Sequence, residues 1–445
     1  MKIAIFHLGF FYSGGGEKLV LEEIRGLRSL GHEVTCFAPF VDRERCFPGV
    51  SEMDGIRSLL PPPPHWLPMS DVLWVTISCL LIPLMARRFR SFDVFLGANQ
   101  PGPWFAWVLS KILRKPYVIY LAQPLRLLHP RAIDLEYGIR IREGDHRFLM
   151  ALKKLAGRLI DGADRVSVRN ASIVLTNGEH VSRWIRDVYG VRNRICPAGC
   201  HPLEERELNY PDRWREKISV NGVEVQKPFV LLTNRHSPMK RFEFALWAFK
   251  SFLKQAPDLP LIITGQETEY TNQLRYLAKS LGLERTIHFV GLVAESELER
   301  LYREASVYVY PSPEEDFGMG IVEAMAAGTS VVAWKNGGPT VTVRNGQTGY
   351  LVEPYDTDRF AQRILDLATN PSLAERLGRA GHRRVKELFS YERHIRVLEE
   401  SLLYAVQPHE FTAPDREIVA PVYPTVERMN QPAMASLVEQ DDVVN

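Results

Sequence analysis

Short apolar runs alternate with segments of helical periodicity along most of the chain. In the first half, apolar runs with the length of strands occur at residues 3–6, 33–38, 92–96, 117–121 and 172–176. The segments between them repeat apolar residues at three- and four-residue spacing, as Val20, Ile24 and Leu27 do. This spacing predicts amphipathic helices. Strands that alternate with helices are typical of parallel sheets with helices on both faces.

The same alternation starts again after a polar stretch. The strand-like runs of this second series are at residues 229–233, 261–264, 287–290, 307–310, 330–333 and 350–352, with helical patterns at 241–254, 270–281, 296–305 and 318–327. We therefore predict an α/β protein with two doubly wound, Rossmann-like domains that face a central cleft. Ligands of such sheets bind beyond the carboxyl ends of the strands.

A chain of 445 residues exceeds what one hydrophobic core usually supports, so more than one domain is expected. Changes in the hydrophobic pattern divide it into five parts. The predicted first domain covers residues 1–205, a polar linker 206–227 and the second domain 228–390. Residues 391–404 are predicted to form a terminal helix that can cross back to the first domain. Repeated prolines after Tyr404 predict an extended or disordered tail at 405–445.

The composition is that of an ordinary globular protein. Hydrophobic residues make up 45% and charged residues 24% of the chain, and the net charge is +2. No basic, aromatic-interleaved module indicates a nucleic-acid partner. The five cysteines contain no CxxC pair, which predicts reduced thiols in a cytoplasmic protein.

An apolar segment at residues 72–86 is followed by Arg87, Arg88 and Arg90. It is shorter than the roughly 20 residues that a membrane span needs, and Pro83 interrupts it. A membrane span is therefore the least favoured of three interpretations. The other two are a buried core helix and an interfacial helix whose arginines face anionic lipid. The basic helical stretch at 139–169 is predicted to be mostly a solvated face, with a membrane-facing or acceptor-facing role as the alternative.

Two carboxylates, Glu315 and Glu323, flank a glycine-containing turn that follows the strand-like run 307–310. Backbone N–H groups at a helix N-terminus can hold a diphosphate, and carboxylates accept hydrogen bonds from sugar hydroxyls. This spacing indicates a nucleotide-sugar site, although an ordinary strand–loop–helix joint with solvated acids has the same pattern.

Two further loops follow predicted strands. Arg235 and Lys240 leave the end of the run 229–233, where cations can neutralise a leaving diphosphate. Glycines 14–16 follow the first strand and allow the backbone to approach a phosphate or sugar closely. They lack both the GxGxxG spacing and the Walker lysine, so NAD and ATP are poor candidates.

Together these motifs give a family resemblance. The chain combines the glycine turn after its first strand, Arg235 and Lys240, the sequence EDFGMGIVEAMAAG from Glu315, and NGGP from Asn336. It resembles the retaining family-4 glycosyltransferases of the GT-B fold, especially mannosyltransferases that act on lipid-linked oligosaccharides and cell-surface glycans. The resemblance covers about residues 1–400 and is most specific at 229–355.

The resemblance implies a set of roles. Arg235, Lys240 and Glu315 would be the catalytic group: the two cations bind the diphosphate, and the carboxylate contacts the donor hexose. Glu323 would hold the ribose hydroxyls. The other donor-binding positions implied are Gly15, Gly16, Asp316, Phe317, Gly318 and Met319. No metal or cofactor is implied, because the basic groups replace a metal.

The chain departs from the subgroup at one position. Related transferases carry a histidine beside the reacting sugar, where this chain has Ala122. Gln123 or His129 are candidates to replace it. His7 after the first strand and Arg126 are further candidates for sugar or acceptor contacts, with a structural histidine and a surface salt bridge as the respective alternatives.

The predicted function is transfer of a hexose, with GDP-mannose as the first choice of donor, to a glycan or lipid-linked acceptor hydroxyl. UDP-glucose and UDP-N-acetylglucosamine are the alternative donors. A sugar-nucleotide epimerase and a non-catalytic relative are the rival classes, and Ala122 supports only the latter. The protein is expected in the cytoplasm, at the cytosolic face of a membrane, as a peripheral protein.

Overall fold

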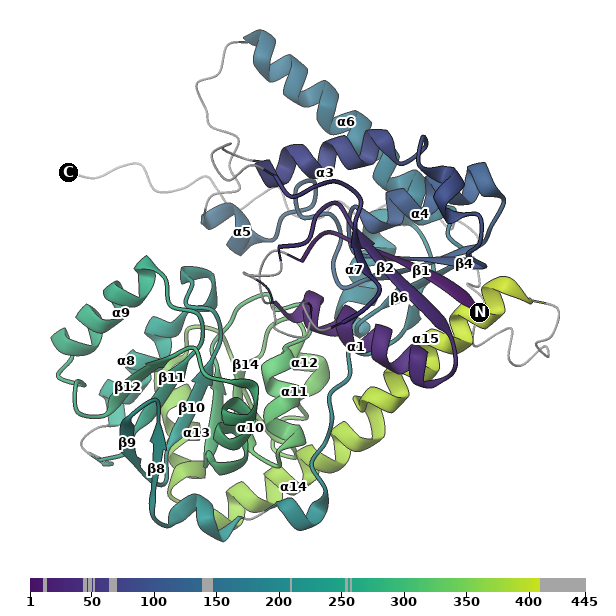
Figure 1. Ribbon diagram of the computed structural model, residues 1–445. Coiled ribbons are helices and arrows are strands. Elements are labelled where there is room, and N and C mark those ends of the chain that lie inside the picture. Colours follow the sequence, from purple (N-terminus) through teal and green to yellow (C-terminus); the bar gives the residue numbers. More distant parts are fainter. Residues whose placement is uncertain are drawn as a thin grey trace, which may run out of the picture.

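The computed structural model describes residues 1–10, 14–42, 46, 50, 53–63, 70–137, 147–208, 210–252, 255–256 and 258–408. These residues form two parallel sheets, each covered by helices, and one small hairpin (Figure 1). The prediction of two doubly wound α/β domains is confirmed. Most of the predicted tail at 405–445 lies outside the described residues.

The first domain is built on a parallel sheet of seven strands. In spatial order they are β3 (Ile56–Ser58), β2 (Glu33–Ala38), β1 (Lys2–His7), β4 (Val94–Ala98), β5 (Tyr117–Leu121), β6 (Ile173–Thr176) and β7 (Arg194–Ile195). The strands β4, β5 and β6 are buried along their whole length, and β1 is buried at every residue after Lys2. This is why they read as continuous apolar runs.

Helices cover both faces of this sheet. One face packs against α1 (Gly15–Ser29) and the C-terminal α15 (Tyr391–Val406). The other packs against α4 (Gly102–Leu113), α6 (Arg147–Arg169) and α7 (Glu179–Tyr189). Two short segments, α3 (Ser70–Leu81) and α5 (Ala132–Glu136), complete the domain.

The second domain repeats the plan with six parallel strands. Their spatial order is β12 (Ile287–Gly291), β11 (Leu261–Thr264), β10 (Val230–Thr233), β13 (Val307–Tyr310), β14 (Ser330–Trp334) and β15 (Gly349–Val352). The covering helices are α8 (Phe242–Phe252), α9 (Glu269–Ser280), α10 (Glu295–Glu304), α11 (Met319–Ala326), α12 (Pro339–Thr342), α13 (Thr357–Ala368) and α14 (Pro371–Leu388).

The strand order fixes where each domain can bind a ligand. In the first sheet the order reverses between β1 and β4, and in the second between β10 and β13. The crevice at such a switch point, beyond the carboxyl ends of the strands, is where doubly wound sheets bind ligands. The loops predicted to carry the site follow β1, β10 and β13, so all of them leave a switch point.

The predicted linker contains structure of its own. Within 206–227, β8 (Lys217–Val220) and β9 (Val223–Gln226) form an antiparallel hairpin. Its apolar residues Ile218, Val220 and Val225 belong to the core of the second domain. Apolar and polar residues alternate on either side of Asn221-Gly222, which is a strong hairpin signal. Sequence reasoning missed it because the stretch as a whole is polar.

The last described helix returns to the first domain. Figure 1 shows α14 and α15 as a long diagonal, light green to yellow, that runs from the second domain to the first. Leu398 and Leu402 of α15 are fully buried against the first sheet. The two domains are therefore joined by two crossings of the chain.

Candidate active site

Glu315 lies in the loop between β13 and α11 and is held by three donors from the second domain. Its Oε2 accepts hydrogen bonds from Lys240 Nζ at 2.6 Å, Tyr310 Oη at 2.8 Å and Ser312 Oγ at 3.3 Å. Burial opposes the charge on this carboxylate, but Lys240 and the hydrogen bonds outweigh it and lower the pKa of Glu315 to about 2. Glu315 is therefore an anion at every physiological pH.

Two glycines of the next loop fix the backbone around Glu315. A Cβ on Gly337 would lie 2.4 Å from the Glu315 carbonyl oxygen, and one on Gly338 would lie 2.4 Å from Phe317 Cα. Gly338 N–H also donates to the Glu315 carbonyl at 2.5 Å. The NGGP motif thus lets two backbones touch, which no other residue at these positions would permit.

The start of α11 is set by Gly318, whose φ of +88° lies in the left-handed region. The ring of Phe317 turns away into the core, edge-on to Phe389 at 5.7 Å between centroids. What Phe317, Gly318 and Met319 can offer a ligand is consequently the backbone N–H groups at the beginning of a helix, as the sequence suggested.

Glu323 lies one turn into α11 and joins the two domains. Its Oε2 accepts from Tyr302 Oη at 3.1 Å, and its Oε1 pairs with Lys18 Nζ at 3.2 Å. Lys18 belongs to α1 of the first domain and also contacts Glu295 Oε1 at 2.8 Å. Sequence reasoning found Glu323 but missed Lys18 and Tyr302. The signal for Lys18 was a cation directly behind the glycine turn.

Arg235 and Lys240 occupy the loop after β10. Lys240 is at the end of a short 3-10 helix, Pro238–Lys240, and points to Glu315. Arg235 is exposed, and within the described residues its guanidinium has no hydrogen-bond or ionic partner. The loop thus presents one cation already neutralised by Glu315 and one that is available.

In the first domain, the glycine turn lies directly against α11. A Cβ on Gly15 would be 3.9 Å from the Met319 side chain, and one on Gly16 would be 3.9 Å from the ring of His7. His7 is buried and pairs with buried Glu17, Nε2 to Oε1 at 3.3 Å, while its Nδ1 lies 3.3 Å from the Ala98 carbonyl oxygen. These contacts give His7 a structural environment next to the glycine turn.

Asp316 and Arg126 form a second ionic contact between the domains. The Arg126 guanidinium donates to Asp316 and, at 3.1 Å, to both carboxylate oxygens of Asp134. Burial raises the pKa of Asp316 to about 6, although Arg126 opposes the shift. Arg126 is therefore only partly exposed, and the surface salt bridge considered from the sequence is a partly buried one between the two domains.

Three more contacts join the two domains on this side. Arg131 donates to the Glu314 carbonyl oxygen at 2.7 Å, and the backbone N–H of Ile133 donates to Glu314 Oε2 at 3.0 Å. Arg241 pairs with Glu136 at 2.6 Å. Sequence reasoning missed these residues, because nothing local distinguishes a charged residue that crosses a domain boundary from a solvated one.

The candidates for the missing histidine are placed differently. The backbone N–H of Ala122 donates to Asn99 Oδ1 at 2.9 Å. Gln123 is half-buried, with no side-chain hydrogen bond to any described residue. His129 instead lies against Tyr189 and 3.8 Å from Asp161, both in the first domain. Burial and then Arg165 lower the pKa of His129.

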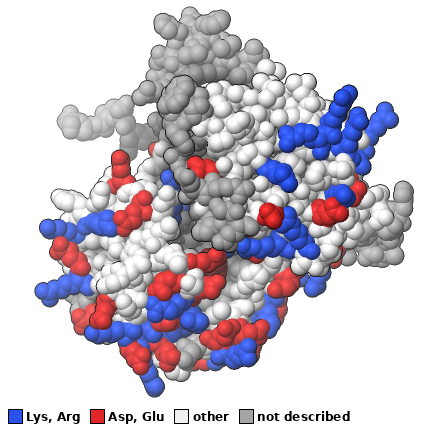
Figure 2. All heavy atoms as spheres, viewed as in Figure 1, with Lys and Arg blue, Asp and Glu red and all other residues white. Residues whose placement is uncertain are grey.

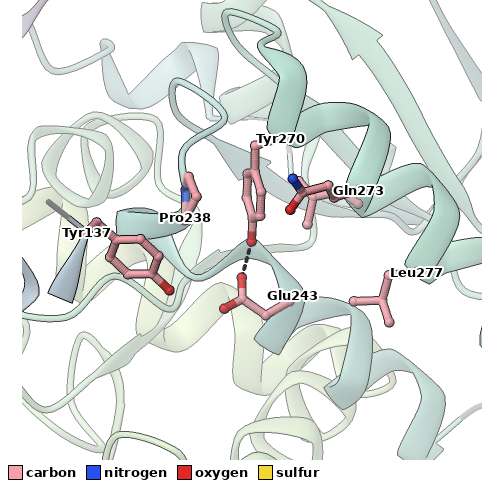
Figure 3. Close-up of a pocket in the computed structure, with 7 residues that line it drawn as sticks. Tyr137, Pro238, Glu243, Tyr270, Gln273 and Leu277 are labelled. Carbon is pink, nitrogen blue, oxygen red and sulfur yellow. Dashed lines mark hydrogen bonds between the residues drawn. The ribbon is translucent and has the colours of Figure 1, made fainter.

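A pocket of about 270 Å³ lies beside the Lys240 loop. Tyr137 of the first domain faces Pro238, Glu243, Tyr270 and Leu277 of the second across it, and the Tyr270 hydroxyl donates to Glu243 (Figure 3). None of the sequence-predicted site residues lines this pocket. Because its main polar groups already bond to each other, we do not assign it to the donor.

Neither metal ligation nor a membrane span is visible in the described part of the chain. No group of three or more histidine, cysteine, aspartate or glutamate side chains there is arranged to hold a metal ion. No helix in the same residues combines the length and the apolar character that crossing a membrane requires.

Two doubly wound domains whose switch points face each other define the GT-B class of glycosyltransferases, and solved structures agree. Sucrose-phosphate synthase from Thermosynechococcus elongatus matches with a TM-score of 0.69 at 19% identity, over 90% of this chain and 98% of that one. Anabaena Alr3699/HepE in complex with UDP matches with a TM-score of 0.67 at 17% identity, over 90% and 99%. At these identities the likeness establishes the fold.

The family follows from sequence comparison. Residues 13–202 match the model of Glycosyltransferase Family 4, and residues 214–384 match that of Glycosyl transferases group 1. D-inositol 3-phosphate glycosyltransferase from Rhodococcus erythropolis is 33% identical over 85% of this chain and 84% of its own length. Alpha-1,3/1,6-mannosyltransferase ALG2 from Dictyostelium discoideum is 26% identical over 88% and 95%. The chain belongs to the family-4 glycosyltransferases and is a hexosyltransferase.

Proposed function

We propose that this glycosyltransferase moves mannose from GDP-mannose to a hydroxyl of a glycan or lipid-linked acceptor, without a metal and with retention of anomeric configuration. The observation that carries the proposal is the Lys240–Glu315 pair at the switch point of the second domain, 2.6 Å between Nζ and Oε2. In this proposal Lys240 would bind the diphosphate and Glu315 would contact the sugar. The similarity to a mannosyltransferase over nearly the whole chain favours mannose.

The donor would lie across α11. Glu323 would accept the ribose hydroxyls, the N–H groups of residues 317–319 would meet the diphosphate, and Glu315 would accept hexose hydroxyls. Arg235 and Lys240 would stabilise the charge that develops on the leaving diphosphate. Gly15 and Gly16 would close over it, and Asp316 would orient Arg126 toward the cleft.

The reaction needs no group from outside these residues. The bond between the sugar's anomeric carbon and the diphosphate oxygen breaks while a bond to the acceptor oxygen forms on the same face. The acceptor proton passes to the departing phosphate oxygen. Because the phosphate serves as the base, a histidine at position 122 is not required for proton transfer. Its replacement by Ala122 instead means that another residue has to hold the sugar's 6-hydroxyl.

UDP-linked glucose or N-acetylglucosamine is the second candidate donor. The observation in its favour is that the structural neighbour HepE was solved with UDP and glucose. The family assignment stands against the epimerase and the non-catalytic protein that were the rival classes from the sequence, and turnover of a donor tests it directly. The experiment is donor binding and slow hydrolysis with GDP-mannose, UDP-glucose, UDP-N-acetylglucosamine and UDP-galactose in the presence of EDTA.

Each outcome of this experiment decides between named alternatives. Turnover of one donor that is lost in Glu323→Ala supports a metal-independent transferase and identifies its sugar. Binding without turnover requires lipid-linked acceptors to be tried before a non-catalytic protein is accepted. Binding of none of the donors overturns the proposal.

Peripheral membrane association of the first domain is the final part of the proposal. Val72, Leu80 and Leu84 on and just after α3 are 59%, 72% and 80% exposed, and Arg87, Arg88 and Arg90 follow. Figure 2 shows basic side chains gathered over the first domain at the upper right of the view. Exposed apolar residues beside arginines suit an anionic lipid surface.

Vesicle flotation tests this part separately. The wild type should float with vesicles containing anionic lipid and not with neutral ones, and Leu80→Ser/Leu84→Ser should lose most of the bound fraction. Equal recovery with both kinds of vesicle, or an unchanged double variant, would count against membrane association and leave the transferase assignment intact.

A further inference from the structure

We propose that Lys18 is a phosphate-reading residue of the donor site, and that it leaves Glu323 for the diphosphate when a nucleotide sugar binds. The inference rests on the proposed function, since it takes Glu323 as the ribose acceptor. Its own basis is the position of Lys18, which lies between the two domains and pairs with Glu323. Among the described residues, Glu323 is the only predicted site carboxylate that contacts α1.

The first observation is where the ammonium lies. Lys18 Nζ is 3.2 Å from Glu323 Oε1, so it occupies a position that a ribose hydroxyl would need. The other oxygen, Oε2, is taken by Tyr302 Oη at 3.1 Å. Each oxygen of Glu323 thus already has one partner, and a ribose hydroxyl that takes the position of the ammonium on Oε1 must displace Lys18.

The second observation is what surrounds the displaced ammonium. Lys18 is one turn into α1, and Glu323 is one turn into α11. The starts of these helices lie close together, because a Cβ built on Gly15 would be 3.9 Å from Met319 Cγ. Both helix N-termini carry partial positive charge. This region therefore disfavours an unpaired ammonium and attracts a diphosphate. A bound diphosphate would in turn give the Lys18 ammonium a new anionic partner.

The third observation concerns the strength of the existing contacts. The Lys18 side chain is 37% exposed, and its other partner, Glu295, is 65% exposed. Ion pairs of this kind contribute little net stability. A contact with a diphosphate is charge-assisted and carries more negative charge, so exchange of the carboxylate for the phosphate is favourable once the nucleotide is in place.

Nucleosides and nucleoside diphosphates separate this role from a merely structural one. In Lys18→Met, a nucleoside should bind as well as in the wild type or better, because Glu323 no longer has a competing partner. The matching nucleoside diphosphate should bind roughly tenfold more weakly, the loss of one charge-assisted contact. Lys18→Arg should recover most of the diphosphate affinity.

The measurement is the dissociation constant of GDP and guanosine, and of UDP and uridine, for the full chain, by calorimetry or ligand-detected NMR. Lys2→Met is the matched control, since Lys2 forms an ion pair with Glu33 at 3.1 Å at the amino end of β1. It should change neither constant. Glu295→Gln, which removes one competing carboxylate, should bind the diphosphate at least as tightly as the wild type.

The results that overturn the inference are distinct from those that overturn the function. If Lys18→Met changes nucleoside and diphosphate affinity by the same factor, or changes neither, Lys18 has a structural role while the transferase assignment stands. If Lys18→Met does not fold, a weaker diphosphate affinity in Glu295→Gln has the same meaning. If the wild type binds neither GDP nor UDP, both proposals fail together.

Discussion

Lys240 Nζ lies 2.6 Å from Glu315 Oε2 and ties together the loops that leave β10 and β13, the two strands at which the second sheet reverses its order. Glu315 thereby stays ionised in a buried position, where a carboxylate alone would take up a proton. In the proposed donor site, this pair would have to open or rearrange when a diphosphate binds. The proposal therefore predicts that stability and activity are coupled through this contact.

Lys240→Met should remove both the stabilisation and the activity. In the wild type the pKa of Glu315, about 2, lies below its ordinary value of 4.5. Its ionised form therefore stabilises the fold above about pH 4.5, and this stabilisation is lost as the pH falls toward 2. A shift of that size corresponds to roughly 3 kcal/mol. In the variant, burial raises the pKa of Glu315 instead. Urea unfolding should show a deficit that is largest at pH 7 and at least ~1 kcal/mol smaller at pH 4.

Lys335→Met is the control for Lys240→Met. Lys335 pairs with Glu353 at 2.7 Å, but both side chains are more than half exposed. Its loss should change the free energy of unfolding by less than about 1 kcal/mol and leave donor affinity unaltered. A pH-independent deficit in Lys240→Met would refute the coupling to Glu315.

Asp316 should produce an acid limb in the pH profile of kcat/KM. Its pKa is raised to about 6, so below that pH it is protonated and no longer offers Arg126 an anion. The wild type should lose kcat/KM as the pH falls through 6. Asp316→Asn should be about tenfold less active at pH 7.5, from the loss of one charge-assisted contact, and should show no titration near 6.

Asp316→Asn should lose activity but gain stability relative to the wild type as the pH rises. A carboxyl whose pKa is raised by folding costs stability above that pKa, because ionisation is then unfavourable in the folded state. The free energy of unfolding of Asp316→Asn, relative to wild type, should therefore rise between pH 4 and pH 7. A relative value that falls over this range would contradict the assignment of the titration to Asp316.

Gly338→Ala should damage the site through sterics alone. The φ of Gly338 is −51°, which alanine adopts freely, but the new Cβ would meet the Phe317 backbone at 2.4 Å. The loop that carries Glu315 must then move, and displacement of a catalytic group by an ångström can cost about 100-fold in rate. We expect kcat/KM to fall by that order.

Gly157→Ala is the matched substitution. Gly157 lies within α6, and a Cβ there would meet nothing within 4 Å. Because alanine is the better helix former by up to about 1 kcal/mol, this variant should keep full activity and unfold at the same or a higher temperature. Unchanged kinetics in Gly338→Ala would mean that the NGGP loop does not position Glu315.

Gln123→Ala and His129→Ala should differ. Gln123 is half-buried, and its side chain has no hydrogen-bond partner among the described residues. It directly follows Ala122, the position where related transferases carry the histidine. Loss of a hydrogen bond that forms in the transition state costs roughly 100-fold, so kcat/KM of Gln123→Ala should fall by that order. His129→Ala should change kcat/KM less than about threefold, because the ring packs within the first domain.

Initial rates with the identified donor decide between the two residues, with thermal unfolding as a check that both variants fold. A large loss in His129→Ala together with a normal Gln123→Ala would reverse the assignment. Losses in both would mean that the loop after β5 acts through its overall shape.

The sequence by itself determined the two-domain α/β architecture and the approximate ends of the main strands. Each predicted strand is present, with ends shifted by up to two residues. Buried parallel strands must be continuously apolar and their helices must be amphipathic, and both patterns are local. The short strands β3 and β7 were missed, since two or three residues are too few to show a period. The carboxylates Glu315 and Glu323 were found for the same reason, because a strand, a glycine turn and a helix start form a local pattern. The NGGP motif entered only through the family resemblance.

Only the tertiary structure decided which charges meet. Lys18 and Glu323 are 305 positions apart, and Arg126 and Asp316 are 190 apart. Whether such residues pair depends on how two separately folded domains close on each other, and no period or spacing along the chain encodes that angle. The direction of His129, toward α6 and α7, was undetermined in the same way. A local pattern determines where a side chain lies along its helix or strand. Which residue it contacts depends on how elements that are far apart in the chain pack together.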